Sequence, residues 1–430
     1  MPHKNCLLTR TLFFLTIMLG VVFESKGQEL PIYEIPSPSI GSPYHGVTFD
    51  QQGNLYTSTT YYSNQNAGSV IELIPVGSTW NLSTLYTFQG NPYTEPSGVI
   101  LDTMGNVYGT TVEGGAYNSG NVFMLTPNQG GGWTYSSLHD FNPSKGDGAN
   151  PYSALLLVKG HLYGTTCCNG KGAGTVFELS RTKSGSWKER ILYNFPGYAG
   201  DGFVPLGGLI SDAKGNLYGT TIWGGTKTCV EDSRGCGTVF MLSHAKGGWK
   251  ESVLYSFAGG ANDGLRPNST LVMDSSGNLY GTTIWGGNQS CAVPGDPPGC
   301  GILFALNKSN QSWSEVVLHA FAGGSADGAI SGNVLEGALA IDAKGNLFGT
   351  TPFGGNQSCQ GGTYSPNGCG TVFSWRPNTF PTYIILYSFL GLPADGAVPY
   401  SGLTFYGGNL YGTTAVGGVY DLGTVFIVYP

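Results

Sequence analysis

One seven-residue stretch recurs along the whole chain and limits the folds that the chain can adopt. It reads Gly-Asn-Leu-Tyr-Gly-Thr-Thr at residues 277–283, and near-copies of it occupy six other places. The seven copies begin at Gly53, Gly105, Gly160, Gly215, Gly277, Gly345 and Gly408. Their spacing runs from 52 residues (53 to 105) to 68 residues (277 to 345). Seven repeats of this size predict a closed ring of small structural units.

Each repeat contains four short segments rich in β-branched and aromatic residues. In the fourth repeat these segments are residues 208–211, 216–221, 237–242 and 249–257. They are too short for globular helices, and their composition favours strands. The second and third segments are apolar at successive positions, so both faces of their sheet must be covered. A small sheet stacked between two like sheets around an axis meets this need, so the sequence predicts an all-β, seven-bladed β-propeller with four-stranded blades.

The last repeat supplies only three of its four strands. These are residues 402–405, 409–414 and 423–428, after which the sequence stops. Residues 31–36, Pro-Ile-Tyr-Glu-Ile-Pro, resemble the fourth strand of the other repeats. We therefore expect this N-terminal segment to join the last blade as its outermost strand and to close the ring.

The turn before each copy of the motif has its own signature. In the fourth repeat Asp212 precedes Gly215 and Asn216, a combination suited to a tight strand reversal. The third and seventh repeats lack this Asp, and tighter turns are expected there. His161 replaces the Asn in the third repeat, and we interpret it as a residue of a polar turn rather than a catalytic group.

The N-terminus reads as a secretory signal peptide covering residues 1–27. Lys4 and Arg10 precede an apolar run, residues 11–23, that is too short to span a bilayer. Residues 28–430 are then expected to form one propeller domain. The predicted protein is extracellular or periplasmic, monomeric and without a membrane anchor.

Charge and composition restrict the class of partner. The formal net charge is −7, only 10% of the residues are charged, and no basic cluster follows the chain. Nucleic acid is therefore not an expected partner. No cofactor is expected either, since no phosphate-binding loop or metal-ligand motif is present.

Six cysteines occupy equivalent places in three successive loops, between the second and third strands of repeats four to six. A disulfide within each loop is expected in an exported protein, and a zinc site is the weaker alternative because no His lies near any pair. Cys167 and Cys168 are adjacent in the third repeat and form either a vicinal disulfide or free thiols. The three loop pairs are Cys229 with Cys236, Cys291 with Cys300, and Cys359 with Cys369.

The same loops carry the candidate ligand-binding residues. Aromatic side chains beside glycines can stack on sugar rings or anchor a protein, although packing between blades is the alternative. Five other loops contain Asp-Gly, which either forms a turn or contributes to a calcium site; turn formation is favoured because no Asp-x-Asp spacing accompanies it. The aromatic candidates are Trp223, Trp285, Phe353, Tyr61 and Tyr62, and the Asp-Gly residues are Asp147, Asp201, Asp263, Asp327 and Asp395.

The ordered pair of elements GNLYGTT and GTVF, over residues 46–428, resembles the tandem repeats called GloVer. These occur in exported bacterial proteins with varied anchors, and the resemblance implies no activity. The pattern is also similar, more distantly, to NHL-type and virginiamycin B lyase-like propellers. We expect a protein that binds a glycan or a surface protein through the face that carries the cysteine-closed loops of repeats four to six. No residue stands out as catalytic, although propeller enzymes can build a site without a linear motif. A lyase or lactonase, or a structural or adhesive element, are the alternatives.

Overall fold

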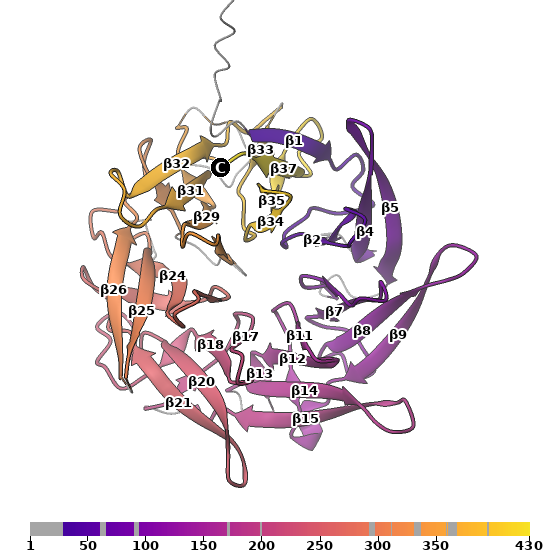
Figure 1. The fold of residues 1–430 in the computed structure, drawn as a ribbon, viewed down its shortest axis with the longest axis horizontal. Coiled ribbons are helices and arrows are strands. Elements are labelled where there is room, and N and C mark those ends of the chain that lie inside the picture. The colour runs from indigo at the N-terminus through magenta and orange to yellow at the C-terminus, as the bar shows by residue number, and fades with distance from the viewer. Residues whose placement is uncertain are drawn as a thin grey trace, which may run out of the picture.

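The computed structural model describes residues 29–60, 66–89, 94–169, 173–197, 200–291, 297–310, 312–330, 337–357, 359, 368–393 and 395–430. Seven sheets stand around one axis (Figure 1), which confirms the seven-bladed propeller. The described residues contain a single short helix, η1 (Pro143–Lys145). None of the described helices is long and apolar enough to cross a membrane.

Each blade starts at the axis with a short inner strand, followed by a second strand that contains the repeated motif. The inner strands are β2 (Thr48–Phe49), β6 (Ile100–Leu101), β11 (Leu156–Val158), β17 (Ile210–Ser211), β23 (Val272–Met273), β28 (Ala340–Ile341) and β34 (Thr404–Tyr406). The second strands are β3 (Leu55–Thr59), β7 (Val107–Thr111), β12 (His161–Thr166), β18 (Leu217–Thr221), β24 (Leu279–Gly286), β29 (Leu347–Thr351) and β35 (Asn409–Thr414).

The third and outer strands complete each antiparallel sheet. The third strands are β4 (Asn66–Val76), β8 (Asn121–Pro127), β14 (Thr175–Arg181), β20 (Thr238–Ala245), β25 (Ile302–Ser309), β31 (Thr371–Trp375) and β37 (Thr424–Val428). The outer strands are β5 (Thr79–Gln89), β9 (Trp133–Asp140), β15 (Trp187–Asn194), β21 (Gly248–Ser256), β26 (Ser312–Ala320), β32 (Tyr383–Ser388) and β1 (Glu29–Glu34).

The N-terminal strand closes the ring, as predicted. Strand β1 pairs antiparallel with β37, from Glu29 opposite Val428 to Glu34 opposite Thr424, and Figure 1 shows β1 beside β37 in the blade that holds the C-terminus. The strand lies two residues earlier than the predicted segment 31–36. The seventh sheet therefore has the order β1-β37-β35-β34.

A glycine and a phenylalanine on neighbouring strands explain why GNLYGTT and GTVF recur together. In six blades the second Gly of the motif pairs with the Phe of the third strand, for example Gly219 with Phe240. A Cβ atom at any of these glycines would lie 2.5–2.7 Å from the Phe ring, so only glycine fits. In the first blade Thr57 replaces the Gly, and the residue paired with it is Ile71 instead of Phe. The two positions have changed together.

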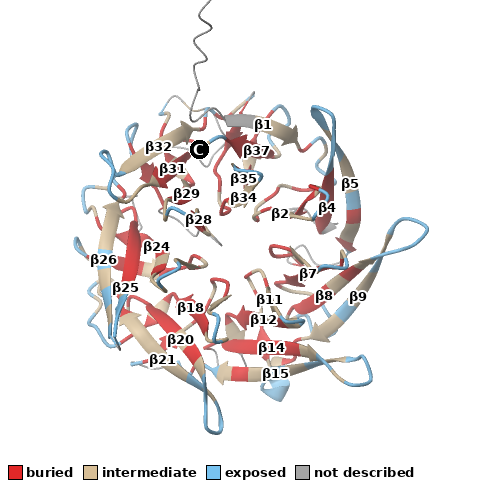
Figure 2. Cartoon of the chain, viewed as in Figure 1, coloured by how far each residue is buried: buried red, intermediate tan, exposed pale blue. Residues whose placement is uncertain are grey.

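Phenylalanine pairs also join one blade to the next. The buried Phe of the third strand contacts, edge to face, a buried Phe at the end of the outer strand of the preceding blade or just beyond it. Such pairs contribute about 0.5–1.5 kcal/mol beyond their area burial. Figure 2 shows the resulting pattern of buried second and third strands and exposed outer hairpin tips. The pairs are Phe88–Phe123, Phe141–Phe177, Phe195–Phe240, Phe257–Phe304, Phe321–Phe373 and Phe389–Phe426, with centroids 5.1–5.4 Å apart.

Hydroxyl groups of the repeated motif link the blades near the axis. In six of the seven interfaces, within the described residues, the first Thr of the Thr-Thr pair, or the Ser in its place, donates to a backbone carbonyl of the next blade. Thr413 completes the circle by donating to the carbonyl of His45, at 2.9 Å. The other donors are Ser58, Thr110, Thr165, Thr220 and Thr350.

The turns between inner and second strands follow the sequence. Asp212 Oδ1 accepts from the amides of Lys214 and Asn216, and its Oδ2 accepts from the Tyr218 hydroxyl. These bonds, through the Asn216 amide and the Tyr218 hydroxyl, help to lower the pKa of Asp212 although its burial acts the other way. In the third blade only two residues, Lys159 and Gly160, connect β11 to β12; the seventh blade has the same arrangement, so both predicted tighter turns are confirmed.

Candidate functional site

In blades three to seven, the loop that follows the repeated motif lies beside the segment that enters the same blade. The segment that enters a blade from the preceding outer strand forms a short ladder with the segment just after the repeated motif. The clearest example is β16 (Gly202–Phe203) with β19 (Trp223–Gly224). Equivalent ladders are β10 (Gly148–Ala149) with β13 (Cys168–Asn169), β22 (Gly264–Pro267) with β24, β27 (Gly328–Ala329) with β30 (Phe353–Gly354), and β33 (Gly396–Ala397) with β36 (Val416–Gly417).

The Asp-Gly residues organise these entry segments. In Asp263, Oδ1 accepts from the amide of Gly264 at 2.7 Å, and Oδ2 accepts from the amide of Ala258 at 2.9 Å and from the Tyr255 hydroxyl at 3.0 Å. Asp147, Asp327 and Asp395 make the same kinds of contact. Because both carboxylate oxygens accept hydrogen bonds from the chain itself, the geometry supports a turn role for Asp263, Asp327 and Asp395. Asp147 shares the backbone contacts of this turn, and its Oδ2 also faces the His139 imidazole.

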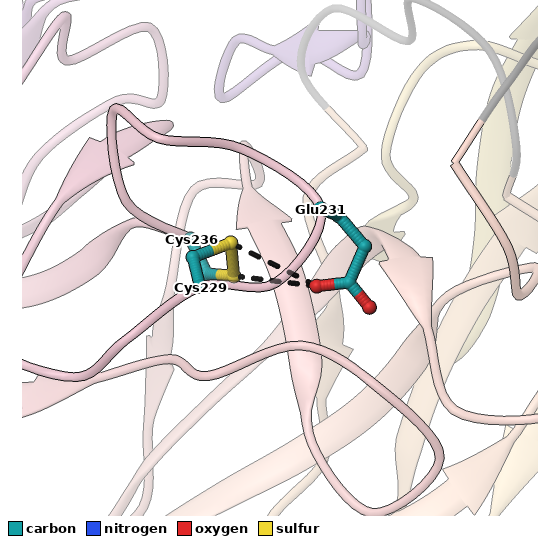
Figure 3. A group of neighbouring side chains, drawn as sticks. All are labelled: Cys229, Glu231 and Cys236. Carbon is teal, nitrogen blue, oxygen red and sulfur yellow. Dashed lines mark hydrogen bonds between the residues drawn. A yellow bond between two sulfur atoms is a disulfide. The ribbon is translucent and has the colours of Figure 1, made fainter.

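The cysteine pairs close three of the long loops. The structure places the sulfurs of all four pairs, including the adjacent Cys167 and Cys168, within disulfide distance. Figure 3 shows the Cys229–Cys236 bond with Glu231 beside it; Glu231 Oε2 lies 3.9 and 4.0 Å from the two sulfurs. Sulfurs joined in a disulfide are not thiolates, and thiolates are what zinc binds.

The aromatic candidates lie in different environments. Trp285 is only 3% exposed and packs in the core between blades four and five. Trp223 and Phe353 are half-buried at the ladders of blades four and six. Tyr61 and Tyr62 lie outside the described residues. The structure thus brings Trp223 and Trp285 into one region and places Phe353 in the neighbouring blade.

Two arginines and one aspartate surround Trp223. The Arg234 guanidinium lies 3.8 Å from the centroid of the Trp223 ring, and the Arg266 guanidinium lies 5.7 Å from that ring and 4.7 Å from the Trp285 ring. Asp232 Oδ2 accepts from both arginines at 2.8 Å. The hydrogen bonds from Arg234 hold the pKa of Asp232 far below its usual range, so this carboxylate stays ionised.

An open pocket of about 420 Å³ adjoins this cluster, and the loop closed by the Cys229–Cys236 bond lines part of it. Most of its lining side chains are polar and able to form hydrogen bonds, and Phe203 forms one aromatic wall. Lys227 stands at the rim, where its Nζ atom donates to the Tyr255 hydroxyl at 2.8 Å and lies 3.4 Å from Asp263 Oδ2. The lining includes Phe203, Thr226, Lys227, Thr228, Asp232, Ser233 and Arg234.

The sequence reasoning missed Asp232, Arg234 and Arg266. The first two sit in a loop with no repeated pattern, so nothing in the sequence singled them out. A signal for Arg266 did exist: it occupies the position before Pro in Asp-Gly-x-x-Pro, where the other repeats with this motif have Asn150, Val204 and Val398. All four adopt a positive φ of 54–59°, and Arg266 is the charged residue among them.

Two overlapping matches to the profile of the Gloeobacter/Verrucomicrobia repeat cover residues 18–231 and 174–426. The chain belongs to the Gloeobacter/Verrucomicrobia repeat family. No sequence among the curated proteins matches this family member. The pocket and the arginine cluster therefore rest on the geometry of this repeat chain alone.

Solved structures align with this Gloeobacter/Verrucomicrobia repeat protein at low identity. A protein from Lactobacillus plantarum is 13% identical, with a TM-score of 0.48, over 80% of this chain and 84% of its own. A protein provisionally described as a gluconolactonase is 13% identical, with a TM-score of 0.40, over 93% and 91%. A protein of unknown function from Dyadobacter fermentans is 11% identical, with a TM-score of 0.43, over 94% and 97%. Scores this low give no argument about activity.

Proposed function

We propose that this repeat protein is an exported binding protein that recognises a carbohydrate in the pocket of the fourth blade. The observation that carries the proposal is the composition of that pocket. It combines hydroxyl side chains (Thr226, Thr228, Ser233), a paired carboxylate and guanidinium (Asp232, Arg234) and one aromatic wall (Phe203). Sugars offer hydroxyl groups to such donors and acceptors and an apolar ring face to such a wall.

The size and rigidity of the pocket support the same conclusion. About 420 Å³ falls in the range of small-molecule sites, roughly 300–1,000 Å³. The Cys229–Cys236 bond and the ion pairs of Asp232 hold the loop in one shape. A pre-formed site loses less entropy when a ligand binds. Trp223 and Trp285 contribute here by supporting Arg234 and Arg266 rather than by direct stacking.

The test is binding of the oxidised protein to a glycan array, followed by titration calorimetry with each glycan that binds. We expect Phe203→Ala and Thr228→Ala to weaken the binding of such a glycan by at least tenfold. Val230→Ala is the matched control, because Val230 lies in the same loop and is 89% exposed, and it should leave the affinity unchanged. If no glycan binds, or if both pocket variants bind as well as the wild type, the proposal is wrong.

A further inference from the structure

A repeated polar contact lies near the outer edge of the disc, between one blade and the next. Near the end of each outer strand from the second to the sixth blade, a His or Tyr side chain contacts the Asp of the following Asp-Gly turn. His139 Nε2 lies 2.9 Å from Asp147 Oδ2. The hydroxyl of Tyr255 donates to Asp263 Oδ2 at 3.0 Å, and the hydroxyl of Tyr387 donates to Asp395 Oδ2 at 2.7 Å. Tyr193 with Asp201 and His319 with Asp327 complete the set.

At three of these interfaces, a glutamate on the outer strand of the next blade lies near the aspartate. The strand pairings of Leu179 with Glu189, Leu242 with Glu251 and Leu306 with Glu315 place three glutamates at one equivalent position. The sixth blade has Tyr383 there. One oxygen of each glutamate is buried and has no hydrogen-bond partner in the protein.

Within the described ranges, a histidine and a glutamate meet at the same aspartate only between the second and third blades. The ligand atoms of His139, Asp147 and Glu189 all lie within 4.8 Å of one another. At the next two interfaces the place of His139 is taken by Tyr193 or Tyr255. At the interface that has His319, Tyr383 stacks on that imidazole at 3.7 Å and no glutamate is present.

We propose that His139, Asp147 and Glu189 form a binding site for a divalent transition-metal ion, with Zn²⁺ as the best fit, that joins the second blade to the third. One imidazole and two carboxylates are a donor set that zinc accepts, and a water molecule can complete its coordination. With a neutral imidazole the two carboxylates carry two negative charges, which the ion neutralises. The ion also gives the buried oxygen of Glu189 the partner that the chain does not supply.

The surroundings hold the ligands in place. Asp147 accepts backbone N–H bonds from Gly148 at 2.8 Å and from Asn142 at 3.1 Å, which orient its carboxylate. The His139 ring packs edge to face on the buried Phe141, with centroids 4.9 Å apart. Such outer contacts orient metal ligands in proteins. The side chains of His139 and Asp147 are 22% and 13% exposed, so an ion can reach the site from solvent.

The repeats supply variants that the fold already tolerates at the same place. His139→Tyr copies the residue at the next two interfaces, and Glu189→Tyr copies Tyr383. Each removes one ligand and places there an aromatic side chain that the architecture accepts at the equivalent position of another blade. His319→Tyr is the matched control, since it makes the same exchange at an interface without a glutamate.

The experiment measures zinc bound to the oxidised chain without an affinity tag. The protein is stripped with a chelator, equilibrated with Zn²⁺ and desalted, and the metal is counted by mass spectrometry. We expect one zinc ion per chain for the wild type and for His319→Tyr, and none for His139→Tyr. Zn²⁺ should raise the melting temperature of the first two proteins only.

Two results overturn the proposal: a wild-type chain that retains no zinc, or a His139→Tyr chain that retains as much as the wild type. If His139→Tyr does not fold, Glu189→Tyr makes the same comparison with the same expected loss. The site lies at a different interface from the carbohydrate pocket, so neither result depends on whether a glycan binds.

Discussion

Two buried glutamates predict that the protein becomes less stable as the pH rises. They are Glu251, at the interface between the third and fourth blades, and Glu315, at the interface between the fourth and fifth blades. Burial raises the pKa of Glu251 to about 7, helped by the neighbouring charge of Asp201. Burial likewise raises the pKa of Glu315 to about 7, with Asp263 acting in the same direction and Lys227 against it. Above pH 7 each glutamate is a carboxylate with one buried oxygen that has no donor. Replacing both by glutamine removes this charge and keeps the shape.

The direction of this pH dependence follows from the pKa values of each glutamate in the folded and unfolded states. A carboxyl group whose folded pKa is about 7, against 4.5 for the ordinary value, stabilises the fold fully below pH 4.5. That stabilisation is lost as the pH rises to 7 and does not change further above it. Raising a pKa from 4.5 to about 7 corresponds to about 3.4 kcal/mol of unfolding free energy. Both side chains keep some contact with water, so we discount this to about 1.5 kcal/mol each.

Thermal unfolding of the chelator-treated protein at several pH values measures the effect. A chain of this length changes its melting temperature by about 1 °C per kcal/mol. We therefore expect the Glu251→Gln, Glu315→Gln double variant to melt about 3 °C above the wild type at pH 8 and to match it at pH 4.5. A double variant that melts below the wild type at pH 8 would refute the reasoning, because the two carboxylates would then be stabilising the fold as anions.

Three further predictions concern the scaffold. Gly219→Ala should destabilise the protein by about 1–3 kcal/mol, since the new Cβ lies 2.7 Å from the Phe240 ring. Adding Phe240→Ile to the same chain should recover part of this loss, because the first blade pairs Thr57 with Ile71. Chemical denaturation measures both effects, and simple additivity of the two changes would contradict the prediction. Deleting residues 28–38 removes β1 and should lower the melting temperature sharply, whereas an unchanged melt would mean that β1 does not hold the ring closed. Peptide mapping of the unreduced protein should find Cys229 with Cys236, Cys291 with Cys300 and Cys359 with Cys369, and any bridge between different loops would contradict the local pairing.

The number of blades and the positions of their strands were predictable because the sequence repeats the same pattern seven times. The period gives the number of blades, the apolar segments give the strands, and residues 31–36 give the strand that completes the last blade. The coupling of glycine to phenylalanine was not predicted, although the sequence holds a signal for it, because Thr57 and Ile71 depart from the pattern in the same repeat.

The candidate site was less predictable because it depends on contacts between segments that do not repeat. Arg234 and Arg266 come from different blades, and both donate to Asp232 in the folded chain. The burial of Trp285 was also not predictable from the repeat. Trp285 lies within the continuous strand β24 and is buried in the core, whereas the equivalent Trp223 lies in the separate short strand β19 and is half-buried.

The pairing of β1 with β37 has a consequence for the order of folding. Six blades are built from strands that follow one another directly in the sequence, so each can form early from contacts at short separation. The seventh must wait until Glu34 meets Thr424, a contact that spans almost the whole chain. Contacts between residues so far apart in the sequence are slow to form. Until this contact forms, strand β37 presents an unpaired edge. Ring closure is therefore expected to be the last and slowest step, during which the nearly complete protein is most exposed to strand exchange with a second copy.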